Sequence, residues 1–437
     1  MRLDRHRLAR IAQSVFDQAW LSGINFAISL LLIRTLDKSE YGLYVLLFNT
    51  VLLFLSLAGA LLSSPFVTLL PQQAEEQRPV VIRVFAVLTL VFALAAALAG
   101  FGGLLAYGRW SADPLLGLAA GLGFSLGVFG SIYRDNIRAL QYTLGNPGQA
   151  LRNNLAYGLL LLAGVGVAVW QDRLSATTVL LISGGAGTVV SGVLLQPVWQ
   201  ALRHDVRAAW RRDGADRACA RKFWDCGRWA LLGALMTFIA SNTYPYLVAL
   251  SFTKSDVADL AASRLLTLPI AMLAMAWTNL ARPTISRLAH EQHHDRLDAL
   301  IRRSIALAAL LTGGMALALW IGSDLIPRLF GDKYAALLPL TLLWTVQTGL
   351  AFIRGVFGSA LMTSNTGYRQ LSRIAAINLV AMVILMAGAT RLGQPEAIVV
   401  ALAVLEILQC LLIERVRRSQ RDTRLSSSAD ETRPVVT

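Results

Sequence analysis

Charged side chains are scarce in this chain. Asp, Glu, Lys and Arg together make up 15% of its 437 residues, whereas soluble domains contain about 25%. Apolar side chains make up 55%, and the mean hydropathy is +0.56. This composition excludes an ordinary soluble domain and predicts a polytopic membrane protein. The net charge of +14 does not indicate nucleic-acid binding, because the basic residues fall between apolar runs.

Cysteine is also rare, with only Cys219, Cys226 and Cys410 in the chain. The first two lie in a predicted cytoplasmic loop and the third near the end of the last apolar run, which excludes a disulfide framework and a Cys-x-x-Cys metal site. A small-residue cleavage site is missing after the basic N-terminal segment, and the apolar run there is too long for a secretory signal. We therefore expect this run to be the first spanning helix.

Apolar runs of spanning length are abundant. A spanning helix needs about 20 mostly apolar residues, and twelve stretches qualify. They are 15–35, 43–70, 80–107, 114–133, 152–170, 177–200, 229–252, 257–280, 304–326, 337–361, 374–390 and 396–413. With the N-terminus inside, and with basic residues near the ends of a stretch counted with the adjoining segment, the cytoplasmic segments hold thirty Lys and Arg and the external segments eight, which leaves Arg264 and Arg354 within the helices. The positive-inside rule then predicts that both termini are cytoplasmic.

Five weak matches indicate that the chain is a duplication. They keep the same order at offsets of 215 to 219 positions: Asn25 with Asn242, Lys38-Ser39-Glu40 with Lys254-Ser255-Asp256, PFVT from Pro65 with PTIS from Pro283, AEEQ from Ala74 with AHEQ from Ala289, and NPG from Asn146 with NTG from Asn365. Six helices separate the copies, so the repeat is parallel, as in transporters that bind substrate between their halves. The fold class we predict is an all-α integral membrane protein with about 12 helices in two pseudo-symmetric six-helix bundles around a central cavity.

This duplication predicts the domain boundaries. An N-lobe covers 1–202 and a C-lobe 229–414, joined by a basic cytoplasmic linker at 203–228 and followed by a disordered polar tail at 415–437. The linker, with its flanking residues from Gln200, carries eight basic residues. We interpret it as an anchor to anionic lipid headgroups, with a docking site for a partner as the alternative.

Two short motifs are better explained by structure than by chemistry. HEQHH, from His290 to His294, fits the zinc pattern H-E-x-x-H, but it is followed by no third ligand at a useful spacing and lies in a predicted connector. No metal and no other cofactor is therefore expected. The G-x-x-x-G spacings at Gly117 and Gly123 are typical of close helix packing. GGAG from Gly184 lies inside an apolar run without a preceding strand, so it does not indicate a phosphate loop.

Polar groups inside the apolar stretches are the candidate binding residues, because an ionisable group in lipid needs a partner, a route to the interface or a function. The candidates are Arg264, Arg354, Arg34, Asn25, Asn242, Asp17, Tyr244 and Glu406. Guanidinium groups suit phosphate oxygens, which they bind with two parallel hydrogen bonds. Four aromatic residues could offer flat faces to sugar rings, although anchoring at the interface is the default for them: Trp20, Tyr246, Trp277 and Trp344.

Structural alternatives stay open for several of these residues. Arg264 could snorkel to the external interface, although we favour a binding role for it. Arg354 could form an ion pair with Glu406, Arg34 could anchor helix one at the external interface, and Asp17 could cap the internal end of that helix. Bends are expected in the seventh and eighth helices, at Pro245 and Pro269 respectively.

The stretch LLIRTLDKSEYGLYVLLFN and its echo SFTKSDVADLAASRLL resemble the polysaccharide-lipid flippases, Wzx-like members of the multidrug/oligosaccharidyl-lipid/polysaccharide exporter superfamily. There, helix one commonly ends in an arginine and a short loop leads to Tyr-Gly, as Arg34, Tyr41 and Gly42 do here. The resemblance covers nearly the whole chain. Arg264 falls on the helix that supplies a cationic cavity residue in related lipid II flippases.

This resemblance implies a transporter, not an enzyme. It would move an undecaprenyl-diphosphate-linked oligosaccharide from the cytoplasmic to the external leaflet by alternating access, without bound ATP, for surface polysaccharide, exopolysaccharide or O-antigen assembly. Its implied partners are this glycolipid, membrane lipids, and a glycan polymerase or chain-length protein. The alternatives are a drug/cation antiporter of the same superfamily, with Asp17 as its carboxylate, and a membrane-embedded glycan polymerase or ligase, which would need a longer external loop.

Overall fold

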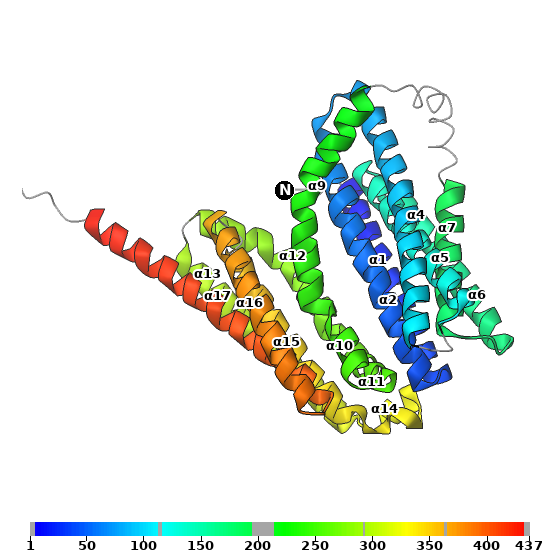
Figure 1. Cartoon of the computed structure of the whole chain (residues 1–437). Coiled ribbons are helices and arrows are strands. Elements are labelled where there is room, and N and C mark those ends of the chain that lie inside the picture. The colour runs from blue at the N-terminus through cyan, green and yellow to red at the C-terminus, as the bar shows by residue number, and fades with distance from the viewer. Residues whose placement is uncertain (1–4, 112–115, 195–213, 292, 362–364, 432–437) are drawn as a thin grey trace, which may run out of the picture. The chain divides into compact units, whose positions relative to one another are not determined.

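A computed structural model describes residues 5–111, 116–194, 214–291, 293–361 and 365–431 (Figure 1). Every regular element within these ranges is a helix, so the predicted all-α class is confirmed. The longer helices of the first part are α1 (Arg5–Thr35), α2 (Lys38–Ala58), α4 (Arg78–Ser111), α5 (Leu118–Thr143), α6 (Pro147–Trp170), α7 (Ala176–Leu194) and α9 (Gly214–Asn242). Those of the second part are α10 (Tyr244–Ser251), α11 (Lys254–Leu265), α12 (Leu268–His290), α13 (His294–Ile321), α15 (Leu338–Leu361), α16 (Asn365–Arg391) and α17 (Glu396–Glu431).

Short helical segments link these elements. After α2 the chain continues through a π-helical turn η1 (Gly59–Ser63), then α3 (Ser64–Leu69), η2 (Leu70–Gln72) and η3 (Glu75–Gln77). In the second part, α14 (Leu325–Phe330) and η4 (Asp332–Leu337) connect α13 to α15.

A described helix lies in each of the twelve predicted apolar stretches, although residues 114–115 and 195–200 of two stretches lie outside the described ranges. Eight are long and apolar enough to cross a membrane, and two broken pairs raise this number to ten. The broken pairs are α9 with α10 and α11 with α12. α5 and the shorter apolar helix α7 account for the remaining two stretches.

The chain divides into two compact units, Met1–Asn242 and Thr243–Thr437. By the repeat, α9 corresponds to α1 and should open the second half. In the structure, however, α9 contacts α2, α3, α4 and η1 of the first unit. Cys219 and Phe223 of α9 are buried in a cluster with Phe66 and Phe85, and Arg83 pairs with Asp216 at 2.7 Å. The lobe boundaries expected from the duplication remain a prediction.

The two units repeat the same pattern of helices. Corresponding helices begin 216 to 220 positions apart, at Lys38 and Lys254, Arg78 and His294, Pro147 and Asn365, and Ala176 and Glu396. The packing repeats as well: α5 contacts α4 and α7, while α15 contacts α13 and α17. This agreement of position and packing supports a duplicated six-helix architecture.

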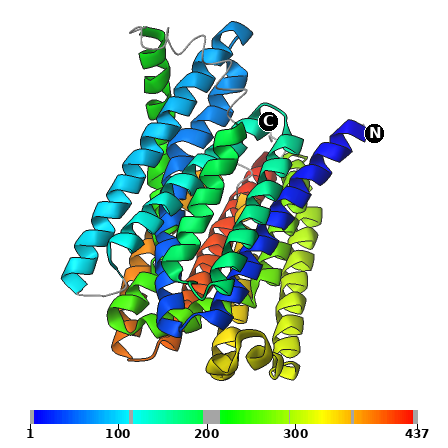
Figure 2. The ribbon, with the colours of Figure 1, turned by 90° about the vertical axis from the view of Figure 1, so that its right-hand side faces the viewer.

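Glycines bring α5 and α7 together, as the G-x-x-x-G spacing predicts, and both views show these two helices side by side (Figures 1 and 2). A Cβ added at Gly130 would lie 2.1 Å from the carbonyl oxygen of Gly184, and one added at Gly123 would lie 2.8 Å from that of Thr177. Since no side chain fits at these distances, the backbones of the two helices are in direct contact.

The tail differs from the expectation of disorder after residue 415. Helix α17 continues to Glu431, while residues 432–437 lie outside the described ranges. Arg417 explains the first turns of this extension, since it binds Glu414 on its own helix and Asp298 on α13. Of the predicted linker, residues 203–213 lie outside the described ranges and the rest belongs to helix α9 from Gly214, so the linker remains a prediction.

Candidate functional site

A broken span in the second unit creates the local geometry around Arg264. Thr253 and Asp256 form a capping box that starts α11, which ends at Leu265. Pro269 follows in the first turn of α12 and has no N–H to donate back to the preceding turn. The backbone N–H and the hydroxyl of Thr267 instead donate to the carbonyl of Arg264, at 3.0 and 2.8 Å. The two helices are bent by 53° at this break.

A second break lies just before Tyr244. Helix α9 ends at Asn242, and α10 begins at Tyr244 with Pro245 in its first turn. The proline again removes a backbone donor and interrupts the helical ladder. Bends were expected at Pro245 and Pro269, and both prolines lie at interruptions of this kind, so these expectations are confirmed.

Arg264 lies beside two aromatic side chains contributed by neighbouring elements. Its Nη1 donates a hydrogen bond to the hydroxyl of Tyr244 at 2.9 Å. Its guanidinium carbon is 5.2 Å from the ring centroid of Trp344 on α15 and 5.6 Å from that of Tyr244. Both rings are buried and lie 5.3 Å apart at 58°. Two fixed rings restrict the position of the cation, and each attracts it by about 0.5–1 kcal/mol or more.

The guanidinium of Arg264 lacks an acidic partner. Within the part of the chain that the structure describes, no carboxylate lies within 4.0 Å of it. Its side chain is nevertheless exposed, although the tyrosine and tryptophan beside it are buried. Arg264 lies ten residues after the first residue of α11, or about 15 Å along the helix, roughly half of a 30 Å hydrocarbon layer. The rings therefore hold this cation in place, and its side chain stays accessible.

Arg354 and Glu406 form the ion pair that the sequence suggested. Arg354 Nε donates to Glu406 Oε2 at 2.5 Å, and Gln347 Nε2 donates to the other carboxylate oxygen at 3.3 Å. The side chain of Glu406 is 11% exposed and that of Arg354 is 38% exposed. Glu406 lies on α17, whereas Arg354 and Gln347 lie on α15, so the pair connects two helices of the second unit.

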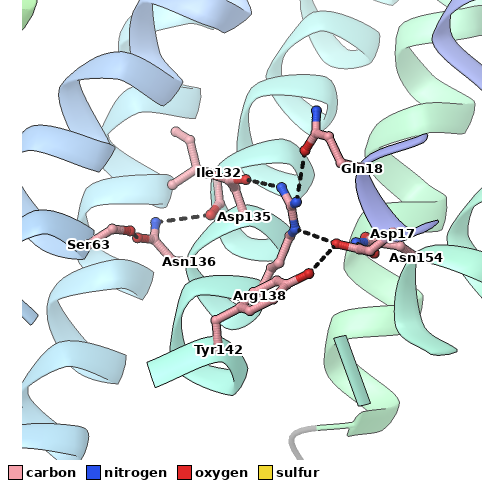
Figure 3. A network of polar contacts seen from close by, with 9 residues as sticks. All are labelled: Asp17, Gln18, Ser63, Ile132, Asp135, Asn136, Arg138, Tyr142 and Asn154. Carbon is pink, nitrogen blue, oxygen red and sulfur yellow. Dashed lines mark hydrogen bonds and ion pairs between the residues drawn. The ribbon is translucent and has the colours of Figure 1, made fainter. Parts of the chain in front are cut away.

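Asp17 is the centre of a polar network in the first unit (Figure 3). The residue is completely buried and accepts hydrogen bonds from Arg138 Nε at 3.1 Å, Tyr142 Oη at 2.8 Å and Asn154 Nδ2 at 2.5 Å. Arg138 also donates to Gln18 at 3.1 Å. Asp17 therefore does more than cap the internal end of α1, because it joins α1 to α5 and α6.

The remaining candidates have different surroundings. Asn25 and Arg34 are exposed on α1. Asn242 contributes its backbone carbonyl, which accepts a hydrogen bond from Asn49 Nδ2 at 2.7 Å. Of the eight predicted residues, Arg264 is thus in contact with Tyr244 and Arg354 with Glu406, while Asp17, Asn25, Arg34 and Asn242 belong to the first unit.

Sequence reasoning missed Arg134 and Arg138. The predicted helix ended at residue 133, which placed both arginines in a cytoplasmic loop. The structure continues α5 to Thr143, with Ile137 and Leu140 buried. The spacing of Ile137 and Leu140 continues the apolar face of the helix. This spacing was the signal that could have extended the predicted helix beyond residue 133.

The HEQHH motif does not have the geometry of a zinc helix. α12 ends at His290 and α13 begins at His294, so the motif does not lie within one helix. Among the described residues, no group of three or more His, Cys, Asp and Glu could hold a metal ion.

Comparison with known proteins identifies a family and a fold. A family model described as polysaccharide biosynthesis protein matches residues 31–339. No curated protein matches the chain.

Several solved structures have the same fold. A lipid II flippase MurJ in an inward closed conformation is similar with 13% identity and a TM-score of 0.69, over 94% of this chain and 87% of that chain. An inward-facing multidrug resistance MATE family transporter of the MOP superfamily has 13% identity and a TM-score of 0.69, over 95% and 99%. A MOP superfamily transporter from Pyrococcus furiosus, described by a binding pocket of reversed polarity, has 14% identity and a TM-score of 0.59, over 94% of each chain.

Proposed function

Since the chain belongs to the family of polysaccharide biosynthesis proteins, we propose that it flips a lipid-linked oligosaccharide across the membrane in which its helices lie. The substrate class is an undecaprenyl-diphosphate-linked oligosaccharide, moved from the cytoplasmic to the external leaflet by alternating access. The protein acts as a transporter rather than an enzyme and resides in a bacterial inner membrane, with both termini in the cytoplasm.

The observation that carries this proposal is the state of Arg264. An arginine in an apolar helix is normally neutralised by a carboxylate, as Arg354 is by Glu406. Arg264 instead lies against Tyr244 and Trp344 and is exposed. Its guanidinium can take two oxygens of a diphosphate while the aromatic faces border a sugar ring. A simple snorkelling role does not account for the break in the helix and the two rings that fix the side chain.

The energetics of the substrate explain why a protein is needed. Each hydroxyl buried without a partner costs at least about 1–3 kcal/mol, so an oligosaccharide does not cross lipid unaided. A polar path removes this barrier while the apolar tail stays in lipid. With the cell interior negative, outward movement of each unneutralised negative charge is favoured by about 2.3 kcal/mol per 100 mV, so the membrane potential assists export of whatever charge the arginines do not neutralise. The product then faces the external enzymes that join or extend glycan units, a glycan polymerase or chain-length protein.

The test replaces Arg264 with glutamine in cells that depend on this protein for surface glycan. Hydrogen bonds to charged groups contribute about 1.5–3 kcal/mol, so we expect surface glycan to fall roughly tenfold or more while lipid-linked glycan accumulates on the cytoplasmic leaflet. Leaflet position is measured by lectin labelling of intact and opened spheroplasts.

The matched control is Arg152→Gln, which removes an exposed arginine of α6. Equal protein levels in the membrane are required for the comparison. Normal surface glycan with Arg264→Gln would refute the role of Arg264.

A drug/cation antiporter is the alternative within the superfamily. It would rely on a carboxylate that is open to a cation, and Asp17 was the candidate. Because Asp17 is completely buried and hydrogen-bonded to Arg138, Tyr142 and Asn154, its charge is already compensated. These hydrogen bonds of Asp17 favour the flippase proposal over the antiporter.

A further inference from the structure

Arg134 is a second arginine of a long helix that has no acidic partner among the described residues. It lies on α5 of the first unit, and its guanidinium carbon is 3.9 Å from the ring centroid of Tyr157 on α6. Its Nη1 is buried and has no hydrogen-bond partner among the described residues, while the side chain as a whole is half-buried. A buried guanidinium nitrogen without an acceptor costs free energy. A purely structural arginine would be expected to find such an acceptor.

The carboxylates of Asp17 and Asp135, in the polar network around Asp17, both lie near Arg138. Arg138, one helical turn further along α5, takes the carboxylate of Asp17 at 3.1 Å and lies 3.9 Å from Asp135. Arg134 makes no ion pair within 4.0 Å in the described part of the chain. Among the described residues, the face of Tyr157 attracts the cation of Arg134, but no carboxylate neutralises its charge.

The repeat shows what Arg134 lacks. Asn146 matches Asn365 in the repeat. Arg134 lies twelve residues before Asn146, and Arg354 lies eleven residues before Asn365. Arg354 of the second unit is neutralised by Glu406, which lies ten residues after the start of α17. The corresponding helix of the first unit is α7.

The matching position on α7 cannot ionise. Ten residues after its start lies Ala186, followed by Gly187. A Cβ at Gly187 would lie 2.9 Å from the carbonyl oxygen of Gly130, one turn before Arg134 on α5, so a larger side chain does not fit at the neighbouring position either. The first unit thus contains the arginine of the repeat without its counter-charge.

We propose that Arg134 and Tyr157 form an oxyanion-binding site in the first unit, in addition to Arg264 in the second. Stacking on Tyr157 leaves the N–H donors of the guanidinium in its plane, where a phosphate or carboxylate oxygen can accept them. The inference rests on the proposed function: the ligand is an oxyanion of the lipid-linked substrate. The same chemistry could come from an anionic phospholipid headgroup, so the experiment separates the two sources.

The test measures binding to the full chain in neutral detergent by thermophoresis. The probes are farnesyl diphosphate, as a soluble isoprenoid diphosphate, and phosphatidylglycerol. The variants are Arg134→Gln, Arg134→Lys and Arg264→Gln, with Arg152→Gln as the control on the helix that supplies Tyr157. We expect Arg134→Gln to weaken diphosphate binding about tenfold. Arg134→Lys should weaken it less, since the charge remains and the planar fork is lost.

The outcomes separate this inference from the proposed function. If Arg134→Gln binds the diphosphate like the wild type while Arg264→Gln binds it about tenfold more weakly, the Arg134 site is refuted and the flippase proposal stands. If neither variant weakens binding, both are refuted. A loss confined to phosphatidylglycerol supports the oxyanion site and assigns it to a headgroup. Melting temperatures are compared throughout, and Arg134→Lys serves as the test if Arg134→Gln does not fold.

Discussion

The arginines within the helices differ in what lies beside them. Arg354 faces Glu406 and Arg138 faces Asp17, whereas Arg264 and Arg134 lie against aromatic rings. An arginine with a carboxylate partner joins two helices. An arginine that contacts only rings keeps donors for an external oxyanion, because a ring neutralises none of its charge. Residue type alone does not separate these two groups.

The Arg354–Glu406 pair predicts a measurable coupling. Glu406→Ala leaves the guanidinium of Arg354 without its counter-charge, and we expect a loss of about 3–5 kcal/mol in stability. Arg354→Leu combined with Glu406→Ala removes both charges and should recover most of that loss. A double-mutant cycle of melting in detergent measures this coupling. Additive single losses would show that the two residues do not stabilise the protein as a pair.

Asp17 predicts a structural phenotype. Asp17→Asn keeps the shape of the side chain and removes the charge that Arg138 faces, so we expect stability to fall by about 2 kcal/mol. Transport per folded molecule should stay near the wild-type level. The measurements are melting in detergent and glycan export normalised to membrane protein. Loss of export with an unchanged melting temperature would instead identify Asp17 as a coupling carboxylate, as in an antiporter.

At the scale of the elements, helix interruptions position the candidate site. Pro245 and Pro269 each follow a break, and the side chains of Tyr244 and Arg264 come from the helical turns beside those breaks. A continuous helix would place successive side chains at fixed 100° steps, so these breaks decide where the two groups point. The prolines are visible in the sequence, but the contact of Arg264 with Trp344 requires α15 to pack beside them.

The α5–α7 contact makes a further prediction. A Cβ at Gly184 would lie 2.1 Å from the carbonyl oxygen of Leu126, so Gly184→Ala should push the helices apart and lower stability by about 1–3 kcal/mol. At the adjacent Gly185 the nearest atom would be 3.9 Å away, so Gly185→Ala is the matched control and should leave the melting temperature almost unchanged. Equal melting temperatures of the two variants would contradict the close backbone contact.

At the scale of the whole molecule, the distribution of basic residues predicts the orientation. With thirty Lys and Arg on one side and eight on the other, both termini should be cytoplasmic. Green fluorescent protein fused to either end should fluoresce, and alkaline phosphatase fused there should be inactive. Phosphatase placed after Leu36, in the predicted first external loop between α1 and α2, should be active. An active phosphatase at either terminus would overturn the predicted topology.

The fold was predictable because it depends on local composition and on spacing within single segments. Lipid excludes unpaired backbone groups, so long apolar runs become helices whatever their neighbours are. The length of α5 was not predicted, because its last turns are polar on one face and the apolar criterion ended it at residue 133. The continuation of α17 beyond residue 415 was missed because the apolar criterion ended this helix too. The contact of Arg417 with Asp298 on another helix is not visible to that criterion.

The sequence by itself determined the helical class, the duplication, the two proline interruptions and the glycine contact faces, because each follows from residues close together or from a constant offset. Only the tertiary structure decided which charges are compensated. Glu406 lies 52 positions from Arg354, and Asp17 lies 121 positions from Arg138. An ion pair forms only where packing brings such distant residues within about 4 Å. That packing compensated those two arginines and left Arg264 and Arg134 against aromatic rings.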